Sequence, residues 1–218
     1  MTLDPSVIVL ATKNANKIKE MTAIFSDTKF KFKTAAELGC PDVVEDGDTL
    51  ETNARKKAYE VARFTNHIAL ADDSGLEVDF LDGAPGVISA RWAGANCSYA
   101  DNCNKLLKSL KGVPHQHRKA KFRSVIALAV PGGATQTVEG AISGFITDKM
   151  KGADGFGYDP VFWVPEFDKT LAEMTSAQKN QMSHRYKALQ AIRPVLINLQ
   201  RNIVSHKPAA KKPPFEII

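Results

Sequence analysis

The stretch Ala69-Leu70-Ala71-Asp72-Asp73-Ser74-Gly75-Leu76-Glu77-Val78-Asp79 decides how this sequence folds. It begins as an apolar run and changes abruptly into two carboxylates, a hydroxyl and a glycine. A buried strand that delivers acidic groups to a cleft at its end has this pattern. Two adjacent carboxylates repel each other unless a positive charge lies nearby, and Mg²⁺ prefers carboxylate oxygens. The stretch therefore favours a metal site, with one Asp as ligand and the other orienting or deprotonating a water.

A plain β-turn, with Asp and Gly in their usual roles, is the alternative interpretation of the run 72–75. We favour the site because an apolar strand leads directly into the pair, so at least one carboxylate is expected to be partly buried.

Length and composition predict one large domain or two small lobes with a sizeable core, because the 218 residues are 44% hydrophobic. Lys and Arg number 29 against 24 Asp and Glu, a net charge of +5 that suits a polyanionic substrate or weak nucleic-acid contact. Residues 201–218 carry several of these lysines among prolines and are expected to form a mobile tail beyond a catalytic domain of residues 1–200.

The cysteines Cys40, Cys97 and Cys103 are odd in number and form no Cys-x-x-Cys motif, which argues against structural zinc and disulfides. No basic and apolar leader is present, and no apolar run approaches the roughly 20 residues of a membrane helix. We expect a soluble cytoplasmic protein.

Strands and helices alternate in the first half of the chain, and a β-meander follows. The expected strands are 7–11, 68–71, 76–80, 121–130 and a partner from about 135 that 140–146 extends. The expected helices are one after 17, 49–64 with Asp48 as N-cap, 100–110, and one from 175 or 176 to about 192 that Pro194 disturbs or ends. This order predicts an α/β fold with a mixed sheet.

Thr12 to Lys17 form a strand-to-helix turn whose free N–H groups and positive helix end favour an anion, with Lys17 adding a charge for a phosphate. An ordinary capped helix with solvated lysines is the alternative, and the glycines of a Walker A loop are absent.

Glu45 could supply a remote metal ligand. Within the basic run 55–57, the spacing allows Lys57 to face the cleft, unlike Lys56.

The loop from Asp154 to Pro160 combines glycines, which allow close approach of a ligand, with Phe156 and Tyr158. An aromatic face can stack on a base, although a hairpin with core aromatics fits equally well.

Lys179 and Ser183 lie on one face of the last helix, followed by His184 and Arg185. The pair His115 and His117 has metal-like spacing but lies in a proline-flanked loop, so we expect it at the surface.

Five segments in order resemble the inosine triphosphate pyrophosphatase family, which hydrolyses non-canonical purine nucleoside triphosphates. They are 11–17, 71–76, 83–91, 155–160 and 183–185, and the resemblance extends to about residue 190. It implies an elongated α/β fold, with a long twisted mixed sheet flanked by helices and two lobes around a central cleft. It also implies a homodimer, no nucleic-acid or membrane partner, and Mg²⁺ as cofactor.

The resemblance also implies the roles of individual residues. Asp73 would be the catalytic proton acceptor, assisted by Asp72, and Glu45 with Asp73 would hold Mg²⁺. The implied substrate-binding residues are Thr12, Lys13, Asn14, Ala15, Asn16, Lys17, Lys57, Ser74, Phe156, Gly157, Tyr158, Asp159, Lys179, His184 and Arg185. Lys13 stands where bacterial members often have Gly, so its charge either strengthens phosphate binding or is exposed.

The implied reaction cleaves a nucleoside triphosphate between the α- and β-phosphates and releases pyrophosphate. ITP, dITP and XTP are equal candidates as substrates, and Mn²⁺ is an alternative to Mg²⁺. Two other functions stay open: a metal-dependent phosphatase acting on small phosphate esters, and a basic nucleic-acid-binding protein.

Overall fold

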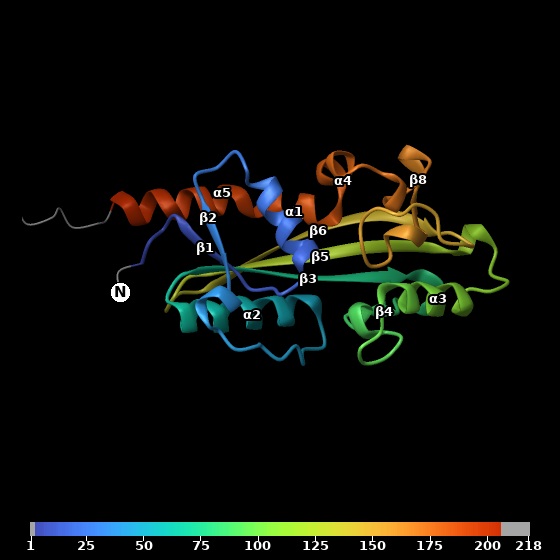
Figure 1. The fold of residues 1–218 in the computed structure, drawn as a ribbon, viewed down its shortest axis with the longest axis horizontal. Helices are drawn as coiled ribbons and strands as arrows, with labels where there is room; N and C mark the ends of the chain where they lie inside the picture. The colour runs from blue at the N-terminus through green and yellow to red at the C-terminus, as the bar shows by residue number, and fades with distance from the viewer. Residues whose placement is uncertain (1–2, 206–218) are drawn as a thin grey trace, which may run out of the picture.

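One long mixed sheet organises the computed structural model, which describes residues 3–205 of the chain (Figure 1). The sheet order over these residues is β2-β1-β3-β5-β6-β7-β8, with β4 paired to β3. The strands are β1 (Val7–Leu10), β2 (Lys31–Thr34), β3 (Ile68–Val78), β4 (Pro85–Gly86), β5 (Lys119–Ala129), β6 (Thr135–Ile146), β7 (Phe162–Val164) and β8 (Lys169–Thr170). β1 runs parallel to β2 and β3, and the remaining pairs are antiparallel. The α/β class with a mixed sheet is confirmed.

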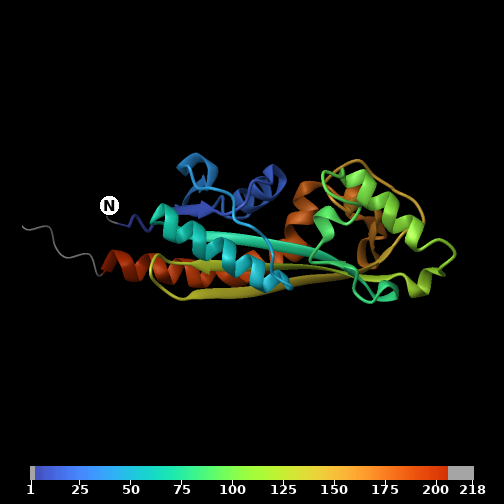
Figure 2. The ribbon, with the colours of Figure 1, turned by 90° about the horizontal axis from the view of Figure 1, so that it is seen from below.

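Helices cover both faces of this sheet, and the molecule is elongated along its long strands (Figures 1 and 2). The helices are α1 (Ala15–Ile24), α2 (Leu50–Thr65), α3 (Tyr99–Ser109), α4 (Ser176–Met182) and α5 (His184–Ser205). α1 and α5 pack with Leu70 on one face, and α2 packs with Ala69 and Ala71 on the other. This division follows from the strand geometry, because successive side chains point to opposite faces.

The sequence predicted two strands, 68–71 and 76–80, on either side of the acidic run, and this prediction was wrong. β3 is a single strand of 11 residues that passes through Asp72, Asp73, Ser74 and Gly75 without a turn. The turn-like composition does not prevail, because each of these residues is paired in register with β5, from Asp72 opposite Ile126 to Gly75 opposite Arg123. The carboxylates therefore lie in the middle of a strand and not at its end.

Long strands connect two apolar regions of the protein. Before Asp72, β3 contributes Ile68 and Leu70 to the core beneath α1 and α5. After Ser74, it contributes Leu76 and Val78 to a second core that includes α3. The polar residues of β3 thus lie where one apolar core gives way to the next, and this interval contains the site described below.

The last predicted helix is two helices, because Ser183 separates α4 from α5 with an extended backbone. Pro194 does not end α5 but lies inside it. Leu189 and Ile192 before the proline and Leu196 after it are fully buried, and their packing outweighs the lost backbone hydrogen bond. α5 continues to Ser205 and so includes the first residues of the expected tail of residues 201–218; residues 206–218 lie outside the described part.

Thr49, and not Asp48, is the N-cap of α2, and its hydroxyl accepts a hydrogen bond from the N–H of Thr52. Along residues 3–205, no helix has both the length and the apolar character required to cross a membrane.

Candidate active site

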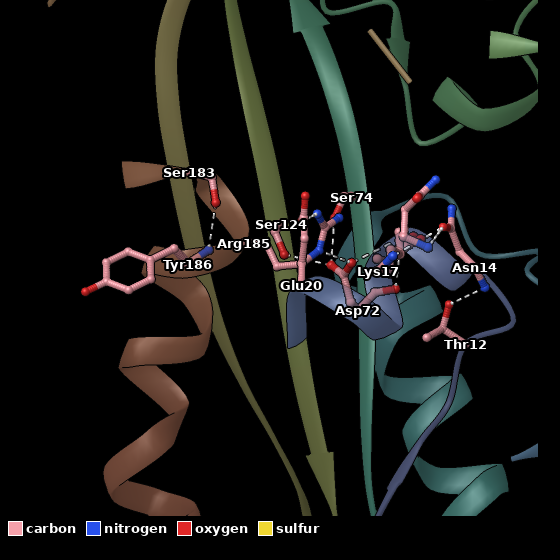
Figure 3. A network of polar contacts seen from close by, with 12 residues as sticks. Thr12, Asn14, Lys17, Glu20, Asp72, Ser74, Ser124, Ser183, Arg185 and Tyr186 are labelled. Atoms are coloured by element: carbon pink, nitrogen blue, oxygen red, sulfur yellow. Dashed lines mark hydrogen bonds and ion pairs between the residues drawn. The ribbon is translucent and has the colours of Figure 1, made fainter. Parts of the chain in front are cut away.

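Asp72 is the centre of a buried polar network on the α1 and α5 side of β3 (Figure 3). Its Oδ1 accepts hydrogen bonds from the hydroxyls of Ser74, at 2.6 Å, and Ser124, at 2.7 Å. Its Oδ2 accepts a hydrogen bond from Arg185 Nε at 2.8 Å and lies 3.2 Å from Lys17 Nζ. Burial alone would raise the pKa of Asp72, but Arg185 and Lys17 hold it well below its ordinary value. Both oxygens of this carboxylate are therefore engaged by protein donors.

Asp73 points to the opposite face of the strand, toward α2. Lys57 Nζ donates to Asp73 Oδ1 at 3.2 Å and lies 3.2 Å from Glu45 Oε1. Asp73 Oδ2 is buried and has no hydrogen-bond partner. Burial raises the pKa of Asp73 to about 6, so this carboxylate is poised to hold a cation or to accept a proton near neutral pH.

Lys57 Nζ contacts three oxygens, since it also donates to the backbone carbonyl of Asp72 at 3.1 Å. Burial lowers its pKa, but Asp73, Glu45 and Asp72 more than offset that effect and leave the pKa above its ordinary value. Lys56 instead pairs with Asp46 at the surface, at 2.6 Å. The predicted difference between the two neighbouring lysines is confirmed.

No group of three or more His, Cys, Asp or Glu that could hold a metal gathers among residues 3–205. Mg²⁺ often takes only one or two protein carboxylates and completes its shell with water and substrate phosphates. The unpartnered Asp73 Oδ2 and the half-exposed Glu45 carboxylate, which share Lys57, are such a donor set. The residues present therefore fit a magnesium ion that is bound together with phosphate.

A cavity of about 440 Å³ opens beside Asp73, and the polar turn after β1 forms part of its lining. Asn14 caps α1, because its side chain accepts hydrogen bonds from the N–H groups of Asn16 and Lys17. The Lys17 side chain enters the cavity and donates to the carbonyl of Asp72 at 3.3 Å. Lys13 lies at the rim, where it forms an exposed ion pair with Asp42. Its charge is thus at the surface in this structure.

A second, smaller cavity of about 90 Å³ adjoins the first, and the two share Asn14, Lys17, Ser74 and Ala90 in their linings. Phe156 lies in this second cavity, with Lys179 Nζ 4.8 Å from its ring centroid. The joined cavities have one charged part and one aromatic part.

Lys179 is held by two carboxylates. Its Nζ lies 2.6 Å from Asp159 Oδ2 and 2.9 Å from Glu20 Oε1. Glu20 Oε2 lies 2.5 Å from an Arg185 nitrogen, so Glu20 bridges the two buried cations. The arrangement fixes Lys179 and Arg185 beside the Phe156 ring.

His184 lines the same cavity and stacks on Phe122, with ring centroids 4.7 Å apart and planes at 9°. Its Nδ1 is buried without a partner. Burial lowers its pKa well below the ordinary value, and Arg185 lowers it further, so the ring is neutral. His115 and His117, in contrast, are exposed, as expected from the sequence.

Most of the predicted site residues come together around the joined cavities. The residues that line them are Thr12, Lys13, Asn14, Lys17, Glu45, Lys57, Asp73, Ser74, Phe156, Gly157, Tyr158, Asp159, Lys179, His184 and Arg185. Asp72 lies beneath the cavities, and Ala15 and Asn16 form the first turn of α1 outside both linings.

Glu20, Ser124 and Tyr99 were not predicted from the sequence, although they contact the network or line the cavities. Arg91, which belongs to the segment 83–91 but was given no role, lines the first cavity. Glu20 is three residues after Lys17 on α1, so helical spacing would have placed it on the same face. Ser124 had no signal, because its role depends on the register between β3 and β5.

Comparisons with known proteins show the family of this chain. The model of the Ham1 family matches residues 8–195. The chain is 44% identical to a dITP/XTP pyrophosphatase of Bacillus licheniformis over 190 residues, 87% of this chain and 97% of that protein. It is 49% identical to a dITP/XTP pyrophosphatase of Desulforamulus reducens over 193 residues, 88% of this chain and 96% of that protein.

Solved structures show the same likeness. A HAM1 protein from Coxiella burnetii matches with a TM-score of 0.81 and 40% identity, covering 88% of this chain and 98% of that one. The Staphylococcus aureus Ham1 protein matches with a TM-score of 0.79 and 41% identity over the same shares. By sequence and by structure, the chain belongs to the Ham1 family.

Proposed function

We propose that this protein hydrolyses non-canonical purine nucleoside triphosphates (ITP, dITP and XTP) to the nucleoside monophosphate and pyrophosphate. The observation that carries the proposal is the pair of joined cavities. One contains Lys17, Lys57 and Asp73, which suit a triphosphate, and the other contains Phe156 and Lys179, which suit a purine. The activity named for the relatives supports the same reaction.

On the phosphate side, Lys17 and Lys57 would stabilise the charge on the departing pyrophosphate, because preformed cations cost little reorganisation during the reaction. Asp73, whose side chain lines the charged cavity, would orient the attacking water and accept its proton. Asp73 and Glu45 would hold the Mg²⁺ ion, which neutralises phosphate charge when it is bound. Asp72, whose oxygens have four protein donors, would fix Lys17 in place from beneath.

On the base side, Phe156 would stack on the purine. Hypoxanthine and xanthine present an oxygen at position 6, where adenine presents an amino group. Lys179 is only 4% exposed, and its ammonium can donate to an oxygen but cannot accept from an amino group. Adenine would place its own amino donor against this ammonium without an acceptor, which disfavours ATP.

We infer that residues 1–200 work as one catalytic domain, with the two apolar regions along β3 as its lobes and the cavities between them. The removal of aberrant nucleotides suits the cytoplasm, where triphosphates are made and used. The homodimer is a further prediction from the family resemblance, and light scattering during size-exclusion chromatography tests it.

A panel of nucleoside triphosphates tests the function, with pyrophosphate and phosphate measured separately and Mg²⁺ present. Release of pyrophosphate from ITP, dITP or XTP, with much slower release from ATP, is the expected result. Phosphate as the first product would indicate a phosphatase. Salt-sensitive DNA binding without hydrolysis would indicate a nucleic-acid-binding protein.

A further inference from the structure

Tyr99 lies at the entrance of the aromatic cavity, although no motif of the sequence includes it. It is the first residue of α3, and its ring centroid lies 5.9 Å from that of Phe156. Its hydroxyl accepts a hydrogen bond from Asn14 Nδ2 at 3.1 Å. Asn14 belongs to the turn after β1, so this contact joins segments from opposite sides of the site.

Three side chains contact the Phe156 ring, and they differ in their freedom to move. Lys179 Nζ lies 4.8 Å and Arg185 Cζ 5.5 Å from the ring centroid, and both residues are held by buried carboxylates. Lys179 is 4% and Arg185 1% exposed, whereas Tyr99 is 43% exposed. A base that stacks on Phe156 therefore displaces or packs against Tyr99 more readily than either cation.

We propose that Tyr99 is a further substrate-binding residue, which forms a movable outer wall of the base pocket. The proposal rests on the purine site described under the proposed function. Two stacking contacts need roughly 7 Å between the outer rings, because carbon atoms approach to about 3.5 Å. The present centroid separation of 5.9 Å, with planes at 49°, is narrower than this. Tyr99 would move outward by about 1 Å or more and then cover the bound base.

The contact with Asn14 places Tyr99 beside the position that the sugar of a bound nucleotide would occupy. Asn14 lines both cavities, whereas Tyr99 lines only the aromatic one. The bond from Asn14 Nδ2 to the Tyr99 hydroxyl thus lies where the charged part of the site meets the aromatic part. A nucleotide that spans the two parts has its sugar at this junction, so Tyr99 acts on the base side and not on the triphosphate.

Steady-state kinetics with ITP test this role in Tyr99→Ala. Loss of an aromatic stacking partner costs about 1–3 kcal/mol, so KM is expected to rise about fivefold or more while kcat stays within about twofold. Inorganic tripolyphosphate, as a competitive inhibitor, probes the charged cavity alone, and its inhibition constant should be unchanged. Tyr99→Phe keeps the ring and should recover most of the loss.

Tyr59→Ala is the matched control, because Tyr59 is 48% exposed on α2 and lines neither cavity of the site. It should leave both constants as in the unaltered protein. An unchanged KM in Tyr99→Ala, or a Tyr99→Phe variant as impaired as Tyr99→Ala, would overturn the aromatic wall. An equal rise in the tripolyphosphate inhibition constant would also overturn it, since the defect would then lie in the charged cavity.

Phe156→Ala separates this inference from the proposed function. If the unaltered protein releases pyrophosphate from ITP and Phe156→Ala raises KM, the purine site stands whatever Tyr99→Ala does. If the unaltered protein releases no pyrophosphate from any purine triphosphate, the proposed function itself fails.

Discussion

Arg185 and Asp72 form a buried ion pair in which Nε and Oδ2 are 2.8 Å apart and the side chains are 2% and 0% exposed. Removing one partner of such a pair leaves an uncompensated charge in the interior. Asp72→Ala should therefore lower the free energy of unfolding by about 3–5 kcal/mol. Urea denaturation followed by circular dichroism measures the change.

A second variant separates the unpaired charge from lost packing. Asp72→Ala combined with Arg185→Met removes both charges and should recover part of the stability. Glu51→Ala, which breaks the exposed Glu51–Arg55 pair, should change stability little. If Asp72→Ala is as mild as Glu51→Ala, the ion pair does not stabilise the protein as proposed.

Asp73→Asn should abolish most of the activity and leave the fold intact. The amide has nearly the same shape, and burial already disfavours the charged carboxylate, so little stability is at risk. Loss of a general base costs about 10²–10⁴-fold in rate, so kcat for pyrophosphate release from ITP should fall at least about 100-fold.

The control for this variant is Asp168→Asn, an exposed aspartate that lines neither cavity of the site. It should retain full activity and the same magnesium dependence. Full Mg²⁺-dependent release of pyrophosphate by Asp73→Asn would refute the assigned role.

His184 should make stability depend on pH below neutrality. Burial lowers the pKa of this ring well below its ordinary value, so the folded protein keeps it neutral where the unfolded chain takes up a proton. The free energy of unfolding therefore rises with pH up to about 6.5. Below that pH it falls by up to about 1.4 kcal/mol for each pH unit. Above that range His184 contributes no pH dependence.

Urea unfolding at pH 7.5, 6.5 and 5.5 measures this slope, which should be smaller in His184→Gln. His117→Gln, which replaces an exposed histidine, should keep the slope of the unaltered protein. Equal slopes in all three proteins would rule out a neutral His184.

Gly140→Ala should disturb α5 where it begins. A Cβ at this position of β6 would lie 2.2 Å from the carbonyl oxygen of His184 and 2.4 Å from the N atom of Ala188. Backbone atoms cannot yield as a flexible side chain does, so we expect a loss of about 1–3 kcal/mol in stability. KM for ITP should also rise, because His184 and Arg185 move with the helix.

Gly133→Ala is the matched control, because the nearest atoms to its added Cβ are 3.5 Å away, an ordinary contact. It should leave the melting temperature and KM unchanged. If Gly140→Ala behaves in the same way, the close approach of α5 does not position the site.

The sequence predicted the class of fold because apolar periodicity is a local property. It indicated the strands β1, β5 and β6 from their apolar runs and the helix α2 from its amphipathic pattern. Pairing with neighbouring strands is not local, and for this reason the run 72–75 was expected to separate two strands. Its pairing with β5 overrides the composition of Asp, Ser and Gly.

The candidate site could be predicted in part. Lys57 was distinguished from Lys56 by helical spacing, and five motifs in order indicated the family. Lys13 could not be placed, because its pairing with Asp42 depends on a loop that follows β2. Helical spacing could have placed Glu20 on the face of Lys17, but not its contacts with Lys179 and Arg185, because these depend on the packing of α4 and α5.

The strand that carries Asp72 and Asp73 restricts how the length of this chain can vary. Side chains along β3 alternate between faces, so one residue inserted between Leu70 and Asp72 would exchange the two carboxylates. The one that pairs with Arg185 would then face α2, and the one beside Lys57 would face α5. Insertions are therefore tolerable in connections such as that between β5 and β6 but not in this strand, where odd or even spacing assigns each carboxylate its partner.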